Sequence, residues 1–317
     1  MSNDCELRDA TACNQPCVAI VIVSYEGCQD TIECIASVTR LTGCSYEIVL
    51  VDQNSLDETV EAVGAEYPFV KILRNPINDG ASGGNNLGLR EALKGSAEYF
   101  LLLNNDTVVA PDMLIKLVSC MEKNKQIGVI GPASFFYSQP NVVCWAGSKI
   151  DWRGRDVGNV IETSIERYGT EIRDTDLVAG GAFLIRKAVV EQVGFMDDRF
   201  FIYFDDTDYC ARARSAGWEL KWLPTARIFH KISQTSVRTG QHFGVYHWQR
   251  NRLLYLWKHG RPRLISCAWC LLGGVKAVFV QIMHRRQKMA IAYFRAIRDS
   301  VSGRWGGAYF RYKYWPK

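Results

Sequence analysis

Short apolar runs alternate with helical patterns along the first hundred residues of this 317-residue chain. The runs are rich in Val, Ile and Leu and do not alternate with polar residues, which is typical of parallel strands buried on both faces. Strands are expected at residues 18–23, 47–51, 70–73 and 99–103, and helices at 31–40, 55–66 and 84–94, the second starting at a capping box formed by Ser55 and Glu58. This alternation predicts a doubly wound α/β fold, whose ligands bind beyond the carboxyl ends of the strands.

Polar residues follow all four expected strands. They are Ser24, Tyr25 and Glu26 after the first, Asp52 and Asn54 after the second, residues 75–86 after the third, and Asn104, Asn105 and Asp106 after the fourth. Neither a G-x-G-x-x-G turn nor a P-loop is present, so the usual dinucleotide and P-loop phosphate sites are not expected. Taken alone, Asp52 is as consistent with a structural role, as a helix cap or a turn residue, as with a role in ligand binding.

Residues 78–88 are rich in glycine and small polar side chains and include Gly80, Gly83, Gly84 and Asn85. Glycines let a backbone approach a ligand closely, and a loop leading into a helix presents amides to phosphate. A flexible loop is the alternative interpretation.

The segment Asn104-Asn105-Asp106-Thr107 ends an apolar strand. Carboxylate and amide oxygens suit a divalent cation such as Mg²⁺ or Mn²⁺, with Asp106 as the expected ligand. Considered in isolation, the segment is better explained as a turn before the helix that starts at Pro111.

Three carboxylates, Asp205, Asp206 and Asp208, follow the apolar run at residues 200–204. Burial and mutual repulsion both disfavour adjacent ionised carboxylates, so a general base or a cation site would explain them. The alternative is a helix N-terminus, where Asp is favoured by free amides and the helix dipole.

Together these motifs resemble the family 2 inverting glycosyltransferases with a GT-A fold, and within them the rhamnosyltransferase-like group. The resemblance rests on residues 23–25, 51–52, 78–85, 103–107, 180–186, 204–208 and His230, in the family's order. It implies a doubly wound mixed sheet flanked by helices and a single displacement that inverts the anomeric carbon.

The resemblance also implies a role for each matched position. Asp206 would be the general base beside Asp205, Asp106 and His230 would bind the metal, and Gly180 and Gly181 would line the acceptor side. His230 could instead be a structural histidine at a strand end. Asn104 replaces the first aspartate of the family's D-x-D element, which predicts weaker cation binding without the nucleotide. The donor-binding set is Ser24, Tyr25, Glu26, Asp52, Asn54, Gly80, Gly83, Gly84, Asn85, Asn104 and Asn105.

Charge divides the chain into two regions. Residues 257–317 carry 13 Lys plus Arg and one acidic residue, Asp299, whereas the preceding residues are net acidic. We expect a polar tail at 1–16, a glycosyltransferase domain at 17–256 with a nucleotide half (17–110) and an acceptor half (111–256), and a basic amphipathic helical region at 257–317. The basic region lacks a nucleic-acid motif, so no nucleic-acid partner is expected.

Residues 264–283 are apolar with Lys276 as the only charge, and basic clusters flank them. A central cation and positive charge at both ends disfavour a membrane span, so a helix lying in the interface of an anionic membrane is expected. A span and a packed core helix are the alternatives. The eleven cysteines and the polar N-terminus, which lacks a secretory signal, indicate a cytoplasmic protein on the inner face of the plasma membrane.

The expected function is transfer of a sugar from a nucleotide-diphosphate donor to a lipid-linked glycan acceptor in the synthesis of cell-surface polysaccharide. The resemblance suggests dTDP-L-rhamnose as the donor, with other hexose donors left open. A sugar nucleotidyltransferase would need a glycine-rich activation loop after the first strand, which residues 24–28 lack. A non-catalytic, membrane-recruited nucleotide-sugar binding protein is the remaining alternative.

Overall fold

A mixed sheet forms the centre of the computed structural model, which describes residues 17–155, 165–179, 181–231 and 240–307. Its strands follow the order β3-β2-β1-β4-β9-β6-β10-β5, with β7 paired to β6 and β8 to β10. The strands are β1 (Val18–Ser24), β2 (Tyr46–Asp52), β3 (Lys71–Arg74), β4 (Tyr99–Asn104), β5 (Thr107–Val109), β6 (Ile127–Phe136), β7 (Gln139–Trp145), β8 (Arg173–Asp174), β9 (Ala182–Arg186) and β10 (Glu219–His230). Strands β1 to β4 are parallel, and β9 joins β4 antiparallel.

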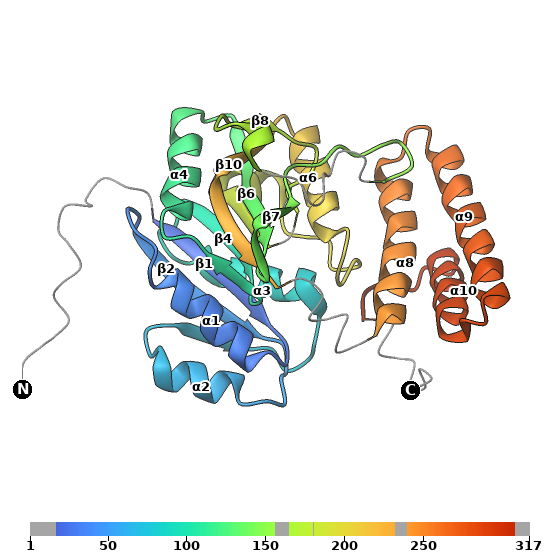
Figure 1. Cartoon of the computed structure of the whole chain (residues 1–317), viewed down its shortest axis with the longest axis horizontal. Coiled ribbons are helices and arrows are strands. Elements are labelled where there is room, and N and C mark those ends of the chain that lie inside the picture. The colour runs from blue at the N-terminus through green and yellow to red at the C-terminus, as the bar shows by residue number, and fades with distance from the viewer. Residues whose placement is uncertain (1–16, 156–164, 180, 232–239, 308–317) are drawn as a thin grey trace, which may run out of the picture.

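The helices form two layers on the sheet and a separate group at its side (Figure 1). They are α1 (Cys28–Val38), α2 (Thr59–Glu66), α3 (Gly80–Ala92), α4 (Met113–Lys123), α5 (Lys187–Val193), α6 (Asp205–Ser215), α8 (Gln241–His259), α9 (Arg263–Met283) and α10 (Gln287–Val301), with a short 3₁₀ turn at Ile165–Tyr168. Residues of α1, α2 and α4 share one apolar core with alternate strand residues such as Ile20, and those of α3, α5 and α6 share the other core with Val21. This three-layer arrangement confirms the predicted mixed α/β fold.

All three predicted helices start at residues other than the expected ones. Helix α1 begins at Cys28, three residues before the expected start at residue 31. Ser55 does not cap a helix, because its Oγ accepts a hydrogen bond from the Glu26 amide at 2.9 Å; α2 begins at Thr59, whose amide donates to Asp57 Oδ1 at 3.2 Å. The expected helix at 84–94 begins at Gly80, so the predicted glycine-rich loop is largely the first turns of α3.

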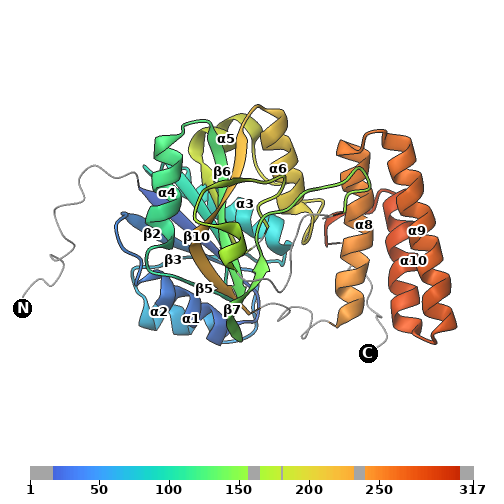
Figure 2. The same ribbon diagram turned by 45° about the horizontal axis from the view of Figure 1, so that its top comes forward.

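The C-terminal helices lie together beside the sheet domain in both orientations (Figures 1 and 2). Helix α8 packs against α9 and α10, and it also supplies Leu253, Leu254 and Leu256 to an apolar core shared with Phe200 and Phe204. The expected domain boundary between residues 256 and 257 therefore falls inside α8.

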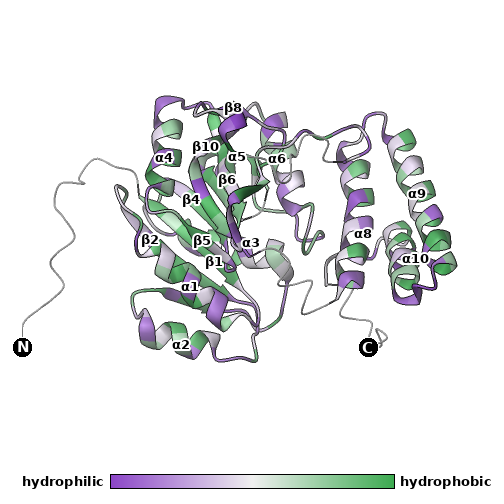
Figure 3. Ribbon diagram, in the orientation of Figure 1, coloured by the Kyte–Doolittle hydropathy of each residue, from purple (hydrophilic) through white to green (hydrophobic). Residues whose placement is uncertain are grey.

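Helix α9 presents large apolar side chains outward, and Figure 3 colours much of it as hydrophobic. Its buried residues are small: Ser266, Cys267, Cys270 and Gly274. Leu264, Leu272, Phe279 and Met283 are between 65% and 82% exposed. Among the described residues, α9 is the helix whose length and composition would allow it to cross a membrane, although a core helix or a signal sequence can pass the same test.

Candidate active site

The predicted polar residues meet at one edge of the sheet, where the parallel strands β1, β2 and β4 end. The strand register aligns Ser24 with Asp52 and Val23 with Asn104. Because the carboxyl ends of parallel strands share an edge, side chains from three separate sequence segments become neighbours there.

Asp52 is the most informative residue of this edge. It is only 4% exposed, and its Oδ2 accepts a hydrogen bond from the Ser55 amide at 3.1 Å. Its Oδ1 is buried and has no hydrogen-bond partner among the described residues. A buried carboxylate oxygen without a donor costs free energy, so this atom is suited to an N–H donor from a ligand.

Tyr25 and Glu26 directly follow β1, and Asn54 follows the end of β2, on loops with unusual backbone conformations. Glu26 and Asn54 have φ angles of 48° and 60°, in the left-handed region that non-glycine residues rarely adopt. Tyr25 is 39% exposed, and partial burial together with the charge of Glu26 raises its pKa. Strain of this kind persists where the surrounding structure enforces it, often at functional sites.

Ser24 and Asn105 support the edge from behind. The Oγ of Ser24 lies 2.8 Å from Thr31 Oγ1, and the Asn105 amide nitrogen donates to both oxygens at 3.3 and 3.0 Å. Ser24 is completely buried, so in this conformation it cannot touch a ligand. We therefore assign Ser24 a positioning role in place of the expected donor contact.

Gln53 is a buried polar residue whose importance the sequence did not reveal. Its Nε2 donates to the Gly80 carbonyl at 2.7 Å, and its Oε1 accepts from Asn75 Nδ2 at 2.9 Å and from the Asp79 amide at 3.1 Å. These bonds tie the end of β2 to the start of α3. The only available signal was its place next to Asp52 at a strand end.

The glycines of α3 serve packing more than ligand approach. A Cβ added at Gly84 would lie 2.2 Å from Gln53 Nε2 and 2.6 Å from Val23 Cγ1, and at Gly88 it would lie 2.2 Å from Val21 Cγ1. Gly80 needs its glycine for two reasons, because its φ is +73° and a Cβ there would lie 2.3 Å from the Phe201 carbonyl oxygen. Gly83 and Asn85 are only partly buried and stay predicted donor contacts.

Asp106 and His230 are brought together by the pairing of β5 with β10, which sets His230 opposite Thr107. His230 Nε2 lies 3.0 Å from Asp106 Oδ1, and both side chains are about 15% exposed. No group of three or more His, Cys, Asp or Glu ligands occurs among the described residues.

Gly181 lies against the same pair. Its carbonyl accepts the Asn104 amide at 3.1 Å, and a Cβ at Gly181 would lie 3.7 Å from His230 Nδ1. Its predicted partner on the acceptor side, Gly180, lies outside the described residues. Asn104 is exposed at the end of β4.

Asp205 and Asp206 begin helix α6 and differ sharply in environment. Asp205 is buried, and burial together with the neighbouring Asp206 charge raises the pKa of Asp205 to about 8. Asp206 is half-buried, and its Oδ1 accepts hydrogen bonds from the amide and hydroxyl of Thr207 at 2.6 and 3.1 Å. The raised pKa favours the protonated form of Asp205, and Asp206 is the more accessible carboxyl group of the pair.

The third carboxylate, Asp208, is structural. It is fully buried and lies 2.8 Å from Arg212, 2.5 Å from Lys258 and 2.8 Å from His259. Burial alone would raise the pKa of Asp208, but the His259 hydrogen bond and the two cations outweigh burial and lower it. Asp208 thus anchors α6 to the end of α8.

The loop that carries the acidic pair is strained and is fixed by α8. Phe201, Tyr203 and Phe204 all have φ angles between 64° and 67°. The buried Asn251 side chain donates to the carbonyls of Phe200, Ile202 and Tyr203 at 2.7 to 2.9 Å. These contacts make α8 part of the active-site support.

Arg250, also fully buried, reinforces the same loop. It donates to the Phe200 carbonyl at 3.0 Å, to the Gly306 carbonyl at 2.8 Å and to Asn251 Oδ1 at 2.9 Å. Neither Arg250 nor Asn251 was singled out from the sequence, because their partners are backbone carbonyls that lie about fifty residues away.

Comparison with known proteins identifies the class. The model of the family "Glycosyl transferase family 2" matches residues 19–194, more than half of the chain. The chain therefore belongs to the family 2 glycosyltransferases and is an enzyme of the hexosyltransferase class.

Its relatives place it near rhamnosyltransferases. It is 26% identical over 289 residues to the dTDP-rhamnosyl transferase RfbF of Shigella flexneri, which covers 86% of this chain and 92% of that protein. It is 23% identical over 249 residues to an N-acetylglucosaminyl-diphospho-decaprenol L-rhamnosyltransferase of Mycobacterium tuberculosis, covering 72% and 80%. The chain is thus a rhamnosyltransferase-like member of its family.

A solved structure with the same fold is the mannosyltransferase PcManGT from Pyrobaculum calidifontis, in complex with GDP-Man and Mn²⁺. The two chains superpose with a TM-score of 0.59 at 14% identity, over 92% of this chain and 88% of the other. This likeness extends to the C-terminal part of the chain and confirms the GT-A type of fold.

Proposed function

We propose that this enzyme transfers L-rhamnose from dTDP-L-rhamnose to a hydroxyl of a lipid-linked glycan, with inversion at the anomeric carbon. The donor and acceptor follow the names of the two rhamnosyltransferases that the chain resembles, one dTDP-dependent and one acting on a decaprenol-linked sugar. The observation that carries the chemistry is the division of the acidic pair into buried Asp205 and accessible Asp206.

Asp52 binds the nucleotide base in this proposal. Thymine, uracil and guanine each carry a ring N–H that can donate to the unsatisfied Oδ1, whereas the matching ring nitrogen of cytosine is an acceptor. Tyr25, Glu26 and Asn54 lie around the base, and the start of α3 with Gly83 and Asn85 lies toward the ribose and diphosphate. A helix N-terminus favours such an anionic group.

Asp106 and His230 are the residues that would hold a divalent cation, Mg²⁺ or Mn²⁺. Their 3.0 Å separation and partial exposure fit a site that takes its remaining ligands from the donor diphosphate. When bound, the cation neutralises charge that develops on the leaving diphosphate. Asn104 contributes no charge, so we expect weak metal binding in the absence of the nucleotide.

Asp206 acts as the general base. It accepts the proton of the acceptor hydroxyl as that oxygen bonds to the anomeric carbon and the bond to the diphosphate breaks on the opposite face. Asp205, held protonated by burial, avoids a second charge beside the base. Asn251 and Arg250 fix the loop that aims the pair, and Gly181 leaves room on the acceptor side.

The C-terminal helices hold the enzyme on the cytoplasmic face of the plasma membrane. Helix α9 buries small residues and exposes large apolar ones, the pattern of a helix that lies in a membrane interface. A membrane span would draw charged residues of the neighbouring α8 and α10, such as Arg252 and Arg295, into the bilayer, which is costly. The proposed membrane-associating region stays at residues 257–317, and its first residues complete α8.

Thermal stabilisation by a panel of nucleotide sugars tests the donor assignment. A ligand at a hundred times its dissociation constant stabilises the folded state by about 2.7 kcal/mol, which gives a clear shift in melting temperature. We expect dTDP-L-rhamnose with Mg²⁺ or Mn²⁺ to give the largest shift. A larger shift with another sugar nucleotide would replace the donor, and stabilisation without transfer would favour a binding protein.

Asp52→Asn is the matched variant for this assay. The Ser55 amide requires an acceptor, so the single carboxamide oxygen stays there and an NH₂ group faces the base. Loss of the shift with dTDP, UDP and GDP sugars is expected because two donors then oppose each other. An unchanged shift would remove Asp52 from the base site.

A further inference from the structure

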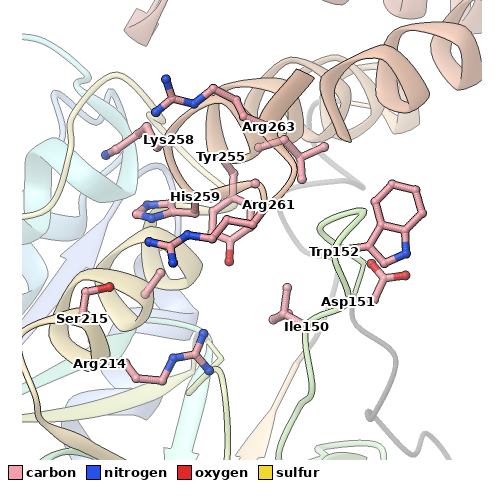
Figure 4. Close-up of a pocket in the computed structure, with 13 residues that line it drawn as sticks. Ile150, Asp151, Trp152, Arg214, Ser215, Tyr255, Lys258, His259, Arg261 and Arg263 are labelled. Carbon is pink, nitrogen blue, oxygen red and sulfur yellow. The ribbon is translucent and has the colours of Figure 1, made fainter. Parts of the chain in front are cut away.

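A cavity of about 470 Å³ lies where α6, the turn between α8 and α9, and the segment at residues 150–152 meet (Figure 4). Its size is within the range of small-ligand pockets, roughly 300–1,000 Å³. Five of its lining residues are basic or can become so: Arg214, Lys258, His259, Arg261 and Arg263. One lining carboxylate, Asp151, opposes them.

Most of these charges already have an ion-pair partner among neighbouring residues. Lys258 pairs with Asp208 at 2.5 Å and with Asp197 at 2.6 Å, and Arg214 pairs with Asp176 at 2.5 Å. Asp151 pairs with Arg155 at 2.8 Å.

Arg261 and Arg263 are different, because neither has a carboxylate within 4.0 Å among the described residues. Arg263 instead lies over the Trp257 ring at 5.0 Å. Within the part of the chain that the structure describes, both guanidinium groups thus lack a carboxylate partner, and a guanidinium group is well suited to bind a phosphate through paired N–H donors.

The start of α9 adds to the positive potential. Arg263 is its first residue after Pro262, and the first amides of a helix have no partner within the helix. The dipole of this 21-residue helix favours an anion at the same place.

The cavity opens where the apolar face of α9 begins. Leu264 and Ile265 are 74% and 53% exposed immediately after Arg263. Trp152 and Trp269 are both exposed, and their rings pack edge to face with their centroids 6.4 Å apart. Arginines and tryptophans beside an apolar face are typical of the headgroup level of a membrane.

The cavity lies beside α6. Its lining residues Arg214 and Ser215 are at the C-terminal end of α6, roughly 15 Å from the acidic pair at 1.5 Å per residue. Its lining residues Lys258 and His259 contact Asp208 in the first turn of the same helix.

We propose that this cavity binds the phosphate group of an anionic phospholipid and so fixes the orientation of the enzyme on the bilayer. The proposal rests on the membrane association proposed above. It assigns to Arg261 and Arg263 a specific lipid contact, beyond the general attraction of a basic surface.

Vesicle co-sedimentation with the full-length protein tests it, using phosphatidylcholine vesicles with and without phosphatidylglycerol. The double variant Arg261→Gln/Arg263→Gln is compared with Arg285→Gln/Arg286→Gln, which removes the same charge from exposed residues at the other end of α9. If the attraction to the membrane is only diffuse, the loss of two charges should lower the vesicle affinity of both variants equally, by roughly thirtyfold. The proposal predicts that the cavity variant loses at least about tenfold more affinity than the control variant. Donor-nucleotide binding in each variant confirms that it is folded.

The outcomes separate the two proposals. Failure of the wild-type protein to bind either kind of vesicle would overturn the membrane association and the lipid site together. Binding that both double variants weaken equally would overturn the lipid site alone. A third outcome would contradict the assignment to a lipid and identify a soluble phosphate ligand. In it, inorganic phosphate without vesicles stabilises the wild-type protein and the control variant but not the cavity variant, while both double variants bind vesicles equally.

Discussion

Replacing Asp205 with asparagine should remove a pH dependence of stability that the wild-type protein shows between about pH 6 and pH 8. Burial and the adjacent Asp206 charge raise the pKa of Asp205 from 3.8 to about 8 in the folded state. Between these two values the folded protein holds a proton that the unfolded chain has released. The free energy of unfolding therefore falls as pH rises through this window.

The size of the effect follows from the same pKa shift. Each pKa unit corresponds to 1.36 kcal/mol, so the fall between about pH 6 and pH 8 is about 2 kcal/mol in the wild-type protein. Asp205→Asn mimics the protonated form at all pH values and should show no such fall. Asp206→Asn removes the neighbouring charge but leaves Asp205 buried, so a smaller slope should persist.

Urea unfolding at three pH values measures these slopes. The two single variants act as controls for one another, because each replaces a carboxyl group with a carboxamide at adjacent positions. Identical slopes in the wild-type protein and Asp205→Asn would refute the assignment of a protonated Asp205. A steeper slope in Asp206→Asn would refute the coupling between the two carboxylates.

Three further changes test the support of the site, the cation and the packing of α3. Asn251→Ala should lower the free energy of unfolding by about 2–5 kcal/mol because it removes the donor to carbonyls of the loop at residues 200–204. Asn124→Ala removes two exposed hydrogen bonds, to Glu219 and from the Gln126 amide, and should cost about 1 kcal/mol or less; equal losses in urea unfolding would contradict the role of Asn251. Asp106→Ala and His230→Ala should each weaken donor binding and abolish its dependence on added Mg²⁺ or Mn²⁺ in calorimetry, and full wild-type activity in excess chelator would rule out the metal role of both. Gly84→Ala should destabilise the protein by about 1–3 kcal/mol because its Cβ would clash with Gln53 and Val23, while Gly273→Ala, with nothing within 4 Å, should be neutral or stabilising in thermal melts; a neutral Gly84→Ala would show that α3 can shift away from the sheet.

The parallel half of the sheet was predictable because its strands are buried on both faces and read as continuous apolar runs. The strands β1, β2, β3 and β4 begin and end within two residues of the expected positions. Once the strands were placed, the polar residues at their carboxyl ends could be predicted to lie close together, because the topology of parallel strands brings those ends to one edge.

The support of the site was not predictable, because it depends on contacts between distant segments. Asn251 looks like an ordinary residue of a polar helix, and only the folded chain shows its side chain against three carbonyls of the loop at 200–204. Asp208 stood in the same acidic cluster as Asp206, but pairing with Lys258 and His259 makes it structural.

Local patterns were also misleading where a tertiary contact replaced a local one. Ser55 and Glu58 match a capping box, yet Ser55 accepts a bond from Glu26 on another loop. The glycines at 80–84 indicated a loop, whereas they lie in a helix where Gly80 packs against Phe201 and Gly84 packs against Val23 of β1 and Gln53 after β2, so that no Cβ fits there.

The most direct test of the proposed mechanism is the initial rate of sugar transfer by Asp206→Asn, measured at saturating concentration of the donor that stabilises the wild-type protein most. The variant keeps the size and hydrogen bonding of the side chain but cannot accept the proton of the acceptor hydroxyl. We expect the rate to fall on the order of a hundredfold or more, with donor binding unchanged. A rate close to that of the wild-type enzyme would show that Asp206 is not the base, and Asp205 would then be the next residue to test.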